Sequence, residues 1–452
     1  MEGDIKDMAH KDTPYWWEAA PPCSAGHRAI EPDCDVAVVG AGYAGLCAAL
    51  HLARAGRKVQ VFEREQLGFG ASSRNGGFTS GNIRPDDKTL IRKFGMERAA
   101  RIAAEGHEAR RFMIDFLARE GIDADFKLVG RFSGAMTRSE YDAMARSAEA
   151  IQRATGIESY AVPLSEVHQH IATDLYAGGS VRMDIGGLHP AKFHAELVRL
   201  AAAEGVLIHS ECRVEGINEG PDKKTVITAR GRTQAREVLV CTNGYTDHSD
   251  RWLRQRLVPL RSRIIATEDL GEERVRDLVP GLKMLTDTRA MTYYFRPSPD
   301  GRRILFGGRD VTSRGDPDSA TQRNYTEMCR VFPQLEGVGV SHSWFGYVAM
   351  NRDMVPRIFQ RGAVHYATGF CGSGVVWAPW LGFKVAQKIL AVPNSESSFD
   401  FRPPRFVPTW RGKAWFMPLV FADLERKDRK LEATASSERA LRNSLRAQGG
   451  DK

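Results

Sequence analysis

Long apolar runs and cysteine are both scarce in this sequence. No stretch reaches the roughly 18 consecutive apolar residues that a membrane-spanning helix needs. Residues 1–30 contain acidic residues and prolines instead of the apolar core of a secretory signal. The 452 residues include seven cysteines, an odd and scattered set without Cys-x-x-Cys spacing, which argues against a disulfide framework and against a metal site. We therefore expect a cytoplasmic protein with reduced thiols, no membrane span and no bound metal.

The positive charge of the chain is concentrated at its C-terminal end. The net charge is +8, and residues 401–452 contribute +6 of it, with twelve Lys/Arg against six Asp/Glu. Because acids alternate with bases in this tail, we expect a solvated helix with a disordered end after Ser436. Nucleic acid is therefore not favoured as a partner.

A nucleotide-binding turn stands near the start of the chain. Residues 35–39 have the pattern of a buried strand, Gly40-Ala-Gly-Tyr-Ala-Gly45 follows, and a helical pattern leads to a second strand that ends at Glu63. In such a βαβ unit Gly40 allows the tight turn, Gly42 lets the backbone approach a pyrophosphate, and Gly45 lets helix and strand pack closely. Glu63 is placed to accept a hydrogen bond from a ribose hydroxyl. The unit predicts a dinucleotide site and leaves open whether the ligand is a nicotinamide or a flavin.

The segment after the second strand decides this by resemblance. Leu67-Gly-Phe-Gly-Ala-Ser-Ser-Arg-Asn-Gly-Gly77 resembles the corresponding segment of the D-amino-acid oxidase superfamily of FAD enzymes, and most closely that of its γ-glutamylputrescine oxidase branch. Small residues allow close backbone approach, serines offer hydroxyls, and Arg74 offers a positive fork. In that family the segment wraps the flavin's pyrophosphate and ribityl chain.

Two further motifs carry the resemblance, which covers roughly residues 15–417. Gly369-Phe-Cys-Gly-Ser-Gly374 is similar to the family's C-terminal flavin loop, with Ser373 where relatives often have His. Residues 344–353, followed by Pro356, resemble its Trp-x-Gly segment, with Asn351 where Thr is usual. A helix that opens at Gly374 would stabilise the negative charge that forms at flavin N1 on hydride transfer.

The resemblance implies non-covalent FAD. Where sarcosine-oxidase relatives attach the flavin through a cysteine, this chain has Arg309 after two glycines, and Cys329 lies in a helical pattern. The residues expected to bind FAD are Gly40, Ala41, Gly42, Tyr43, Ala44, Gly45, Glu63, Arg64, Gly70, Ala71, Ser72, Ser73, Arg74, Asn75, Gly76, Gly77, Val214, Thr242, Asn243, Gly244, Gly346, Cys371, Gly372, Ser373, Gly374 and Val375.

Aromatic residues and arginines on the later strands are the candidates for the substrate face. Aromatic walls hold a cationic nitrogen and exclude water, and an arginine binds a carboxylate through two hydrogen bonds. For each aromatic the alternative is an ordinary core position. We expect His189, Tyr293, Arg296 and Tyr347 to contact substrate, and Arg74, Tyr294, Trp344 and Ser373 to serve catalysis.

The patterns predict an α/β protein with a Rossmann-like FAD-binding domain assembled from discontinuous segments, and an antiparallel-sheet substrate domain with helices. A strand is expected at 126–132, between helical patterns. The expected division is an N-terminal arm at 1–30, an FAD-binding domain at 31–87, 170–245 and 345–392, a substrate or cap domain at 88–169 and 246–344, and a tail at 393–452.

The expected activity is flavin-dependent oxidation of a C–N bond in an amine or amino acid. Hydride passes to FAD N5, the imine hydrolyses to a carbonyl compound plus an amine or ammonia, and O2 (forming H2O2) or an electron carrier reoxidises the flavin. One alternative is an FAD dehydrogenase of a hydroxy acid or polyol, because fold does not fix substrate. Another is a flavoprotein that binds RNA through its basic tail. The amine, the oxidant and the oligomeric state stay open.

Overall fold

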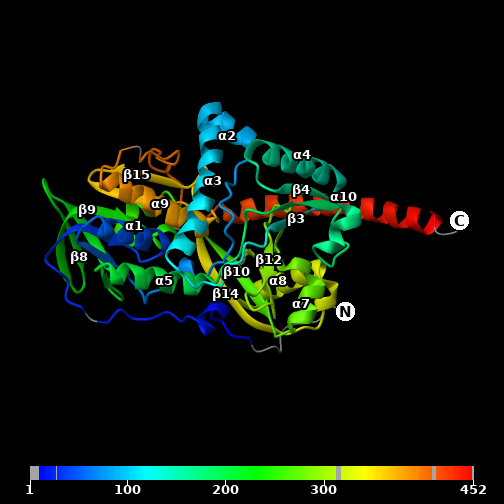
Figure 1. The fold of residues 1–452 in the computed structure, drawn as a ribbon, viewed down its shortest axis with the longest axis horizontal. Helices are drawn as coiled ribbons and strands as arrows, with labels where there is room; N and C mark the ends of the chain where they lie inside the picture. The colour runs from blue at the N-terminus through cyan, green and yellow to red at the C-terminus, as the bar shows by residue number, and fades with distance from the viewer. Residues whose placement is uncertain (1–9, 27, 312–316, 394, 410–413, 450–452) are drawn as a thin grey trace.

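The computed structural model describes residues 10–449 except 27, 312–316, 394 and 410–413, and it contains two eight-stranded sheets. The sheets lie side by side along the long axis of the molecule, with α3 standing between them (Figure 1). This arrangement confirms the predicted α/β class. The position of each domain boundary stays a prediction.

The first sheet is the Rossmann-like one. Its main path is β15-β16-β9-β1-β2-β6, and β1 pairs in parallel with β2 and β9. The strands come from separate parts of the chain: β1 (Asp33–Val39), β2 (Val59–Phe62), β6 (Leu207–His209), β7 (Val214–Glu219), β8 (Lys224–Thr228), β9 (Gly231–Val240), β15 (Arg357–Arg361) and β16 (Val364–Thr368).

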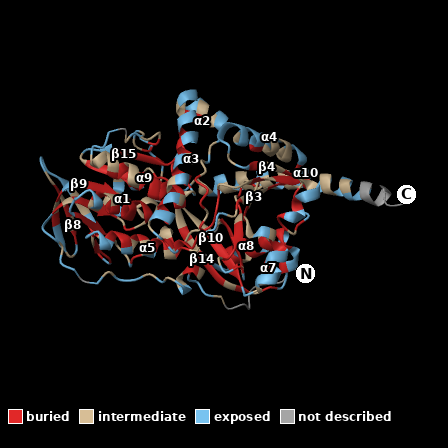
Figure 2. Ribbon diagram, in the orientation of Figure 1, coloured by how far each residue is buried: buried red, intermediate tan, exposed pale blue. Residues whose placement is uncertain are grey.

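Alternation along β1 explains how this sheet is covered. Val36 and Val38 face a helical layer, whereas Ala37 and Val39 belong to a separate core on the opposite face. The helices of the first layer are α1 (Tyr43–Arg54), α3 (Met96–Arg119), α5 (Pro190–Ala203) and α9 (Gly374–Ile389). Both layers together bury the strands, and the exposed residues lie mainly in loops and on the outer faces of the helices (Figure 2).

The second sheet has the order β14-β10-β13-β12-β11-β3-β5-β4 and is antiparallel except for the pair of β3 with β11. Its strands are β3 (Arg131–Ala135), β4 (Ser159–Pro163), β5 (Gly178–Arg182), β10 (Val258–Thr267), β11 (Met284–Asp287), β12 (Tyr294–Pro297), β13 (Ile304–Arg309) and β14 (Val340–Met350). The remaining helices are α2 (Asp87–Phe94), α4 (Arg138–Thr155), α6 (Arg251–Arg254), α7 (Glu272–Leu278), α8 (Pro317–Val331) and α10 (Met417–Gly449). Short 3-10 helices span Tyr15–Glu18, Ala71–Ser73, Leu164–Gln169, Asn243–Tyr245, His248–Asp250, Pro280–Leu282 and Pro333–Leu335.

The N-terminal arm crosses from one sheet to the other along the edge of the molecule (Figure 1). Lys11 bridges to β14, and Cys23 bridges to Leu67 beside the first sheet. Trp16 is fully buried and donates from its indole nitrogen to the Asn75 carbonyl oxygen at 2.9 Å. The prediction that the arm packs on the body is confirmed for the residues that the structure describes.

Two local predictions are wrong. The strand expected at 126–132 begins only at Arg131, because the preceding residues pair through isolated bridges and loop contacts such as Lys127 with Gly187. The tail is not disordered after Ser436, because α10 continues to Gly449. One face of α10 packs on the second sheet's core, where Ala435 is fully buried, and this packing stabilises a helix whose sequence alone is only weakly amphipathic.

Among the described residues, no helix combines the length and the hydropathy of a membrane span.

Candidate active site

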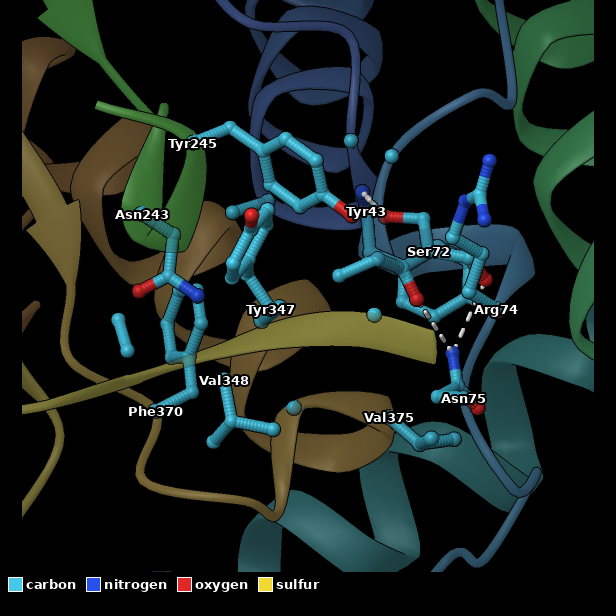
Figure 3. A pocket seen from close by; sticks show the side chains of 18 of the residues that line it. Tyr43, Ser72, Arg74, Asn75, Asn243, Tyr245, Tyr347, Val348, Phe370 and Val375 are labelled. Atoms are coloured by element: carbon cyan, nitrogen blue, oxygen red, sulfur yellow. Dashed lines mark hydrogen bonds between the residues drawn. The ribbon is translucent and has the colours of Figure 1, made fainter. Parts of the chain in front are cut away.

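A single cavity of about 490 Å³ lies where the two sheets meet, and both glycine turns border it. Its wall takes residues from the β1–α1 turn, the segment 68–78, β14 and the turn that precedes α9. Gly42 and Gly374 therefore lie on one cavity, although they are far apart in the sequence. Figure 3 shows side chains from these separate segments pointing toward the same space.

The first end of the cavity is built around the N-terminus of α1. Gly40 has φ = +103°, a conformation that favours glycine. The Ser72 hydroxyl accepts a hydrogen bond from the Tyr43 backbone N–H at 3.0 Å (Figure 3). A β-carbon on Gly42 would fall 3.0 Å from that same hydroxyl oxygen, so backbone and serine meet closely here. Such an N-terminus, with its dipole, is suited to a phosphate group.

Glu63 lies beside this turn, at the end of β2. One carboxylate oxygen accepts from the Ala41 N–H at 3.0 Å and the other from the Glu65 N–H at 3.1 Å. Burial raises the pKa of the Glu63 carboxyl above its ordinary value, against the opposing effect of these two donors. The two N–H donors fix the carboxylate in place. Each oxygen keeps a second lone pair, which can accept a hydrogen bond from a ribose hydroxyl.

The segment from Ala71 to Gly77 is fixed by its own hydrogen bonds. The Asn75 amide donates to the carbonyl oxygens of Ala71 at 3.1 Å and Ser72 at 3.0 Å, and its oxygen accepts from the Gly77 N–H at 2.8 Å (Figure 3). This small-residue segment is therefore a rigid wall rather than a flexible loop.

Arg74 belongs to the same wall and lies between two aromatic rings. Its guanidinium carbon is 4.4 Å from the Trp17 ring centroid and 4.7 Å from that of Phe69. It donates to the carbonyl oxygens of Phe69 at 2.7 Å and Phe345 at 3.2 Å. Burial lowers the pKa of Arg74. These contacts fix the guanidinium at the cavity wall and account for two of its donors.

The second glycine turn is tied to the strand end at Asn243. Asn243 has φ = +45°, and its side-chain oxygen accepts from the Gly369 N–H at 2.9 Å. Gly374 begins α9, and the Ser373 side chain makes no capping hydrogen bond to the first turn of this helix. The first backbone N–H groups of this helix have no intrahelical partner, and Gly374 and Val375 line the cavity.

Aromatic side chains form the wall between the two turns. Tyr245 and Tyr347 meet edge to face with ring centroids 5.4 Å apart, and Val348 and Phe370 lie close by (Figure 3). A planar ring bound between these groups would be shielded from water.

The other end of the cavity carries hydroxyls and arginines. The Tyr294 hydroxyl lies 2.9 Å from Ser262 Oγ, and its ring lies so close to Gly307 that a β-carbon there would fall 2.3 Å from it. Arg84 donates from Nε to the Cys371 carbonyl oxygen at 2.6 Å, and Arg309 donates to Thr292 Oγ1 at 3.4 Å.

Arg84 and Arg309 have no carboxylate partner within salt-bridge distance among the described residues. Arg84 is exposed to solvent and borders the cavity. Burial lowers the pKa of both guanidinium groups, to about 10 for Arg309, and the charge of Arg84 contributes to the decrease at Arg309. The charge of Asp428 opposes this decrease at Arg309 without reaching salt-bridge distance. Two cations near each other, without a carboxylate in direct contact, favour an anionic ligand.

Arg131 also borders the cavity, from the start of β3. Its Nε atom is buried without a hydrogen-bond partner in the part of the chain that the structure describes. Burial, with a smaller effect of Arg182, lowers the pKa of Arg131 to about 10.

Most of the residues expected to bind FAD line this cavity. The exceptions are Gly45, Ser73 and Gly244, which pack behind the wall. Of the residues expected to serve catalysis, Arg74, Tyr294 and Ser373 line it, and of those expected to contact substrate, Tyr347 does.

Four expected site residues do not line the cavity, and their direct roles stay predictions. Trp344 is buried and donates from its indole nitrogen to the Arg74 carbonyl oxygen at 2.9 Å, so it supports the wall. Arg296 donates to the carbonyl oxygens of Leu188 at 2.9 Å and Gly76 at 3.3 Å, which ties segments together behind the wall.

The other two residues, His189 and Tyr293, also make contacts away from the cavity. His189 caps α5, because its Nδ1 accepts from the Lys192 N–H at 3.2 Å, and its ring meets Trp16 at a centroid distance of 4.9 Å. Tyr293 packs in the second sheet's core, with the Arg289 guanidinium 4.1 Å from its ring. Adjacent residues of an extended segment point to opposite faces, so only Tyr294 of this pair reaches the cavity.

Sequence reasoning assigned no role to several residues that line the cavity, notably Phe69, Arg84, Arg131, Tyr245 and Arg309. Phe69 lies within the segment that carries the family resemblance, and Arg309 follows a pair of glycines, so both positions gave a signal. Arg84 stands in a loop without a periodic pattern, and nothing local marks it.

The residues present fit a dinucleotide cofactor. The cavity joins two helix N-termini, a fixed carboxylate stands at the first of them, and an aromatic wall lies between them. Glycine backbone at Gly40, Gly42 and Gly372 leaves room for close approach, since β-carbons there would meet neighbours within 3.2 Å.

Comparison with known proteins gives an independent result. Residues 35–388 match the family described as FAD dependent oxidoreductase (DAO). The chain is 29% identical to γ-glutamylputrescine oxidoreductase of Escherichia coli K12 over 359 residues, which are 78% of this chain and 83% of that protein. It is also 29% identical to the probable oxidoreductase OrdL of Rhizobium meliloti over 416 residues, which are 89% and 93% of the two chains.

Solved structures show the same fold. Glycine oxidase from Geobacillus kaustophilus superposes with a TM-score of 0.69 at 19% identity, covering 84% of this chain and all of that one. L-Proline dehydrogenase from P. horikoshii superposes with a TM-score of 0.65 at 19% identity, covering 80% and 94%.

Proposed function

This chain belongs to the DAO family of FAD-dependent oxidoreductases, and on that basis we propose that it oxidises a C–N bond of an amine that also carries an anionic group. The family resemblance read from the three sequence motifs is thereby confirmed, and so is FAD as the cofactor. Bound FAD supplies a two-electron acceptor for the hydride that the substrate carbon loses. The imine product then hydrolyses to a carbonyl compound and an amine or ammonia.

The relatives support C–N oxidation over the alternatives. The names of those that match include γ-glutamylputrescine oxidoreductase, glycine oxidase and iminodiacetate oxidase, all of which act on amines or amino acids. A hydroxy acid or polyol is therefore not favoured. RNA binding by the tail is not favoured either, because one face of α10 is occupied by the second sheet's core.

The proposal of an anionic substrate rests on the position of Arg84 and Arg309. Both line the cavity that joins the two glycine turns, and neither has a carboxylate partner within salt-bridge distance among the described residues. A substrate carboxylate would compensate both charges and accept charge-assisted hydrogen bonds. The neutral amine nitrogen would then face the aromatic wall and the Tyr294–Ser262 hydroxyl pair.

The remaining groups of the site assist without acting as a general base. The N–H groups at the start of α9 would stabilise negative charge on bound FAD when it accepts the hydride. Tyr245, Tyr347 and Phe370 exclude water from the reacting carbon. The hydroxyl of Tyr294 has its pKa raised to about 12, mainly by burial, so it stays protonated and orients the substrate as a hydrogen-bond partner.

We propose that FAD is bound without a covalent link. Of the two cysteines that line the cavity, Cys371 donates its thiol hydrogen to the Gly369 carbonyl oxygen at 3.0 Å, and burial raises its pKa to about 11. Burial raises the pKa of Cys241 further. A protonated thiol is a poor nucleophile. We also propose a cytoplasmic location, which the seven free cysteines support, and O2 as the oxidant, with an electron carrier as the alternative.

The test is a substrate screen on the purified, FAD-loaded protein. Anaerobic bleaching of the flavin is measured with matched pairs of amines, such as sarcosine and dimethylamine, that differ only in a carboxylate. We expect the carboxylated member to bleach the flavin faster, and we expect peroxide on admission of air. Failure of every amine to bleach the flavin would contradict C–N oxidation, and flavin bleaching without peroxide would indicate a dehydrogenase.

Variants at the two arginines test the anion site separately. R309M and R84M should each lower the preference for the carboxylated amine by about tenfold to a hundredfold, because each removes a charge-assisted hydrogen bond. R302M is the matched control, since Arg302 pairs with Asp269 on the surface of the same sheet. Equal rates for carboxylated and neutral amines in the wild-type enzyme would exclude an anionic substrate and leave C–N oxidation intact.

A further inference from the structure

We infer that Asp428, on the C-terminal helix α10, is a positioning residue that holds the substrate end of the cavity in shape. This inference rests on the proposed function, because it concerns the arginine that would bind the substrate anion. It assigns a role at the active site to a helix that lies beyond residues 35–388, the part of the chain that matches the family.

The helix α10 is fastened to the second sheet by charged and apolar contacts. Glu425 pairs with Arg323 of α8 at 2.9 Å, and Glu432 pairs with Arg330 of α8 at 2.7 Å. Ala435 is fully buried in the core of that sheet. Asp428 lies between these contacts and faces the turn that leads into β12 rather than α8.

The carboxylate of Asp428 holds two consecutive backbone N–H groups of this turn. One oxygen accepts from the Ala290 N–H at 2.6 Å, and the other accepts from the Met291 N–H at 2.9 Å. The preceding N–H, of Arg289, is held by Asp287 at 3.1 Å. Carboxylates therefore fix three successive peptide groups, and the one on α10 accounts for two of them.

The residue that follows is strained and borders the cavity. Thr292 has φ = +63°, which is unfavourable for a β-branched residue and persists only where the surroundings fix it. Its hydroxyl donates to the Ala290 carbonyl oxygen at 3.2 Å and accepts from Arg309 at 3.4 Å. Arg309 thus donates to a strained residue whose turn Asp428 holds from outside the cavity. The charge of Asp428 also acts on Arg309 directly and opposes the decrease in its pKa.

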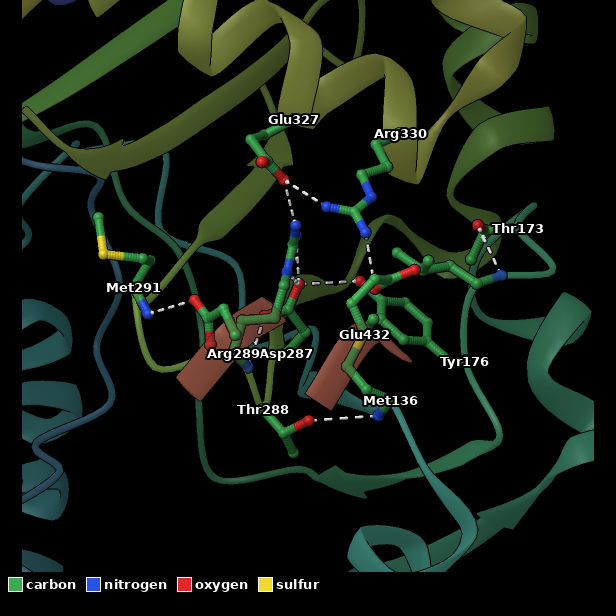
Figure 4. Close-up of polar contacts among 12 residues, drawn as sticks. Met136, Thr173, Tyr176, Asp287, Thr288, Arg289, Met291, Glu327, Arg330 and Glu432 are labelled. Atoms are coloured by element: carbon green, nitrogen blue, oxygen red, sulfur yellow. Dashed lines mark hydrogen bonds and ion pairs between the residues drawn. The ribbon is translucent and has the colours of Figure 1, made fainter. Parts of the chain in front are cut away.

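A partly buried charge network holds the same turn from a second direction (Figure 4). Arg289 pairs with Asp287 at 2.6 Å and with Glu327 of α8. Arg330 pairs with Glu327 at 3.8 Å and with Glu432 of α10 at 2.7 Å. The hydrogen bonds of Asp428 and this charge network both connect the turn to α10. The turn, α8 and α10 therefore form one connected unit.

The experiment compares D428A with E425A in the full-length, FAD-loaded protein. E425A breaks the pair with Arg323, which also fastens α10 to α8, but it leaves the 290–292 turn untouched. Titration with acetate, followed by flavin absorbance, measures carboxylate binding without turnover. The KM and kcat for a carboxylated amine are measured alongside, and hydrogen exchange reports on the peptide that contains residues 290–292.

We expect D428A to raise the acetate Kd and the KM by about tenfold or more, with a much smaller change in kcat. Hydrogen exchange of the 290–292 peptide should become faster. D428N keeps one acceptor oxygen and should show a smaller change in the same direction. E425A should lower the melting temperature without changing the Kd or the KM.

Three results would overturn the inference. Unchanged Kd and KM in D428A and D428N would show that α10 does not act on the cavity. Equal increases of Kd and KM in D428A and E425A would show that α10 affects the site only by stabilising the fold. A wild-type enzyme that oxidises amines with no preference for a carboxylate would contradict the anion site and this inference together, while C–N oxidation would stand.

Discussion

Gly382 of α9 lies directly against Ala44 of α1: a β-carbon on Gly382 would fall 2.3 Å from the Ala44 carbonyl oxygen. The two helices that begin at the glycine turns thus approach each other through bare backbone. Because both helices start at the cavity, this contact sets the distance between the group that would hold the pyrophosphate and the group that would stabilise the flavin ring.

The first prediction follows from this contact. G382A should destabilise the protein by about 1–3 kcal/mol or more, because the added methyl forces α1 and α9 apart. G374A is the matched control on the same helix, since a β-carbon there would meet only the Phe370 β-carbon at 3.8 Å. Thermal unfolding of both apo proteins measures the effect. A melting temperature for G382A equal to that of G374A would mean that the helices can separate without cost.

The second prediction concerns pH and FAD affinity. We expect ionised Glu63 to accept hydrogen bonds from ribose hydroxyls of FAD, and burial raises its pKa. Affinity should therefore fall as pH decreases through that raised pKa, starting above the pH at which an ordinary glutamate would be protonated. E63Q should bind FAD roughly tenfold more weakly at neutral pH and should show a shallower pH dependence. Fluorescence titration of apo protein with FAD between pH 8 and pH 5 measures both. Identical pH curves for the two proteins would remove Glu63 from the FAD site.

The third prediction separates two roles for Trp344. Its indole N–H holds the Arg74 carbonyl oxygen, and the ring does not line the cavity. W344F should cost about 1–3 kcal/mol of stability by leaving that carbonyl unpaired, and kcat at saturating FAD should change little. W415F, at an exposed position, is the control. A loss of kcat of a hundredfold or more, with normal FAD content, would restore a catalytic role.

Local patterns were sufficient where the function depends on neighbouring residues. The turn from Gly40 to Gly45, its flanking strands and Glu63 form one continuous unit, so their relation was readable from spacing. The helix that opens at Gly374 was likewise predicted, and it extends to Ile389 in the structure. In both places the residues that act together are also neighbours in the sequence.

Prediction was less successful where tertiary packing decides. Tyr293 and Tyr294 are identical in kind, and only the register of β12 with β13 shows which one faces the cavity. Arg84 and Arg309 come together from a loop and a distant strand, so no spacing in the sequence connects them. The C-terminal helix was expected to be solvated and then disordered, because its stability comes from a partner surface that the tail's own sequence does not describe.

The last prediction uses His189, which the structure moves from the substrate face to the start of α5. Its neutral ring accepts the Lys192 N–H, and burial is the main cause that lowers its pKa to about 4. The unfolded chain has an ordinary histidine, with a pKa of about 6.5. Between these values the unfolded state binds more protons, so His189 should cost stability as pH falls from about 6.5 toward 4. The loss should reach up to about 3 kcal/mol.

H189N provides the test, because asparagine caps a helix without titrating. Urea unfolding at several pH values between 7 and 4 should show a shallower loss of stability for H189N than for the wild type. Part of the pH-dependent loss of stability should remain in H189N, since burial also lowers the pKa of His209 to about 4. H209N should remove the part of the loss that His209 causes. If H189N and the wild type lose stability in parallel across this range, the cap does not depend on a neutral ring, and His189 is free to take a proton in the folded protein.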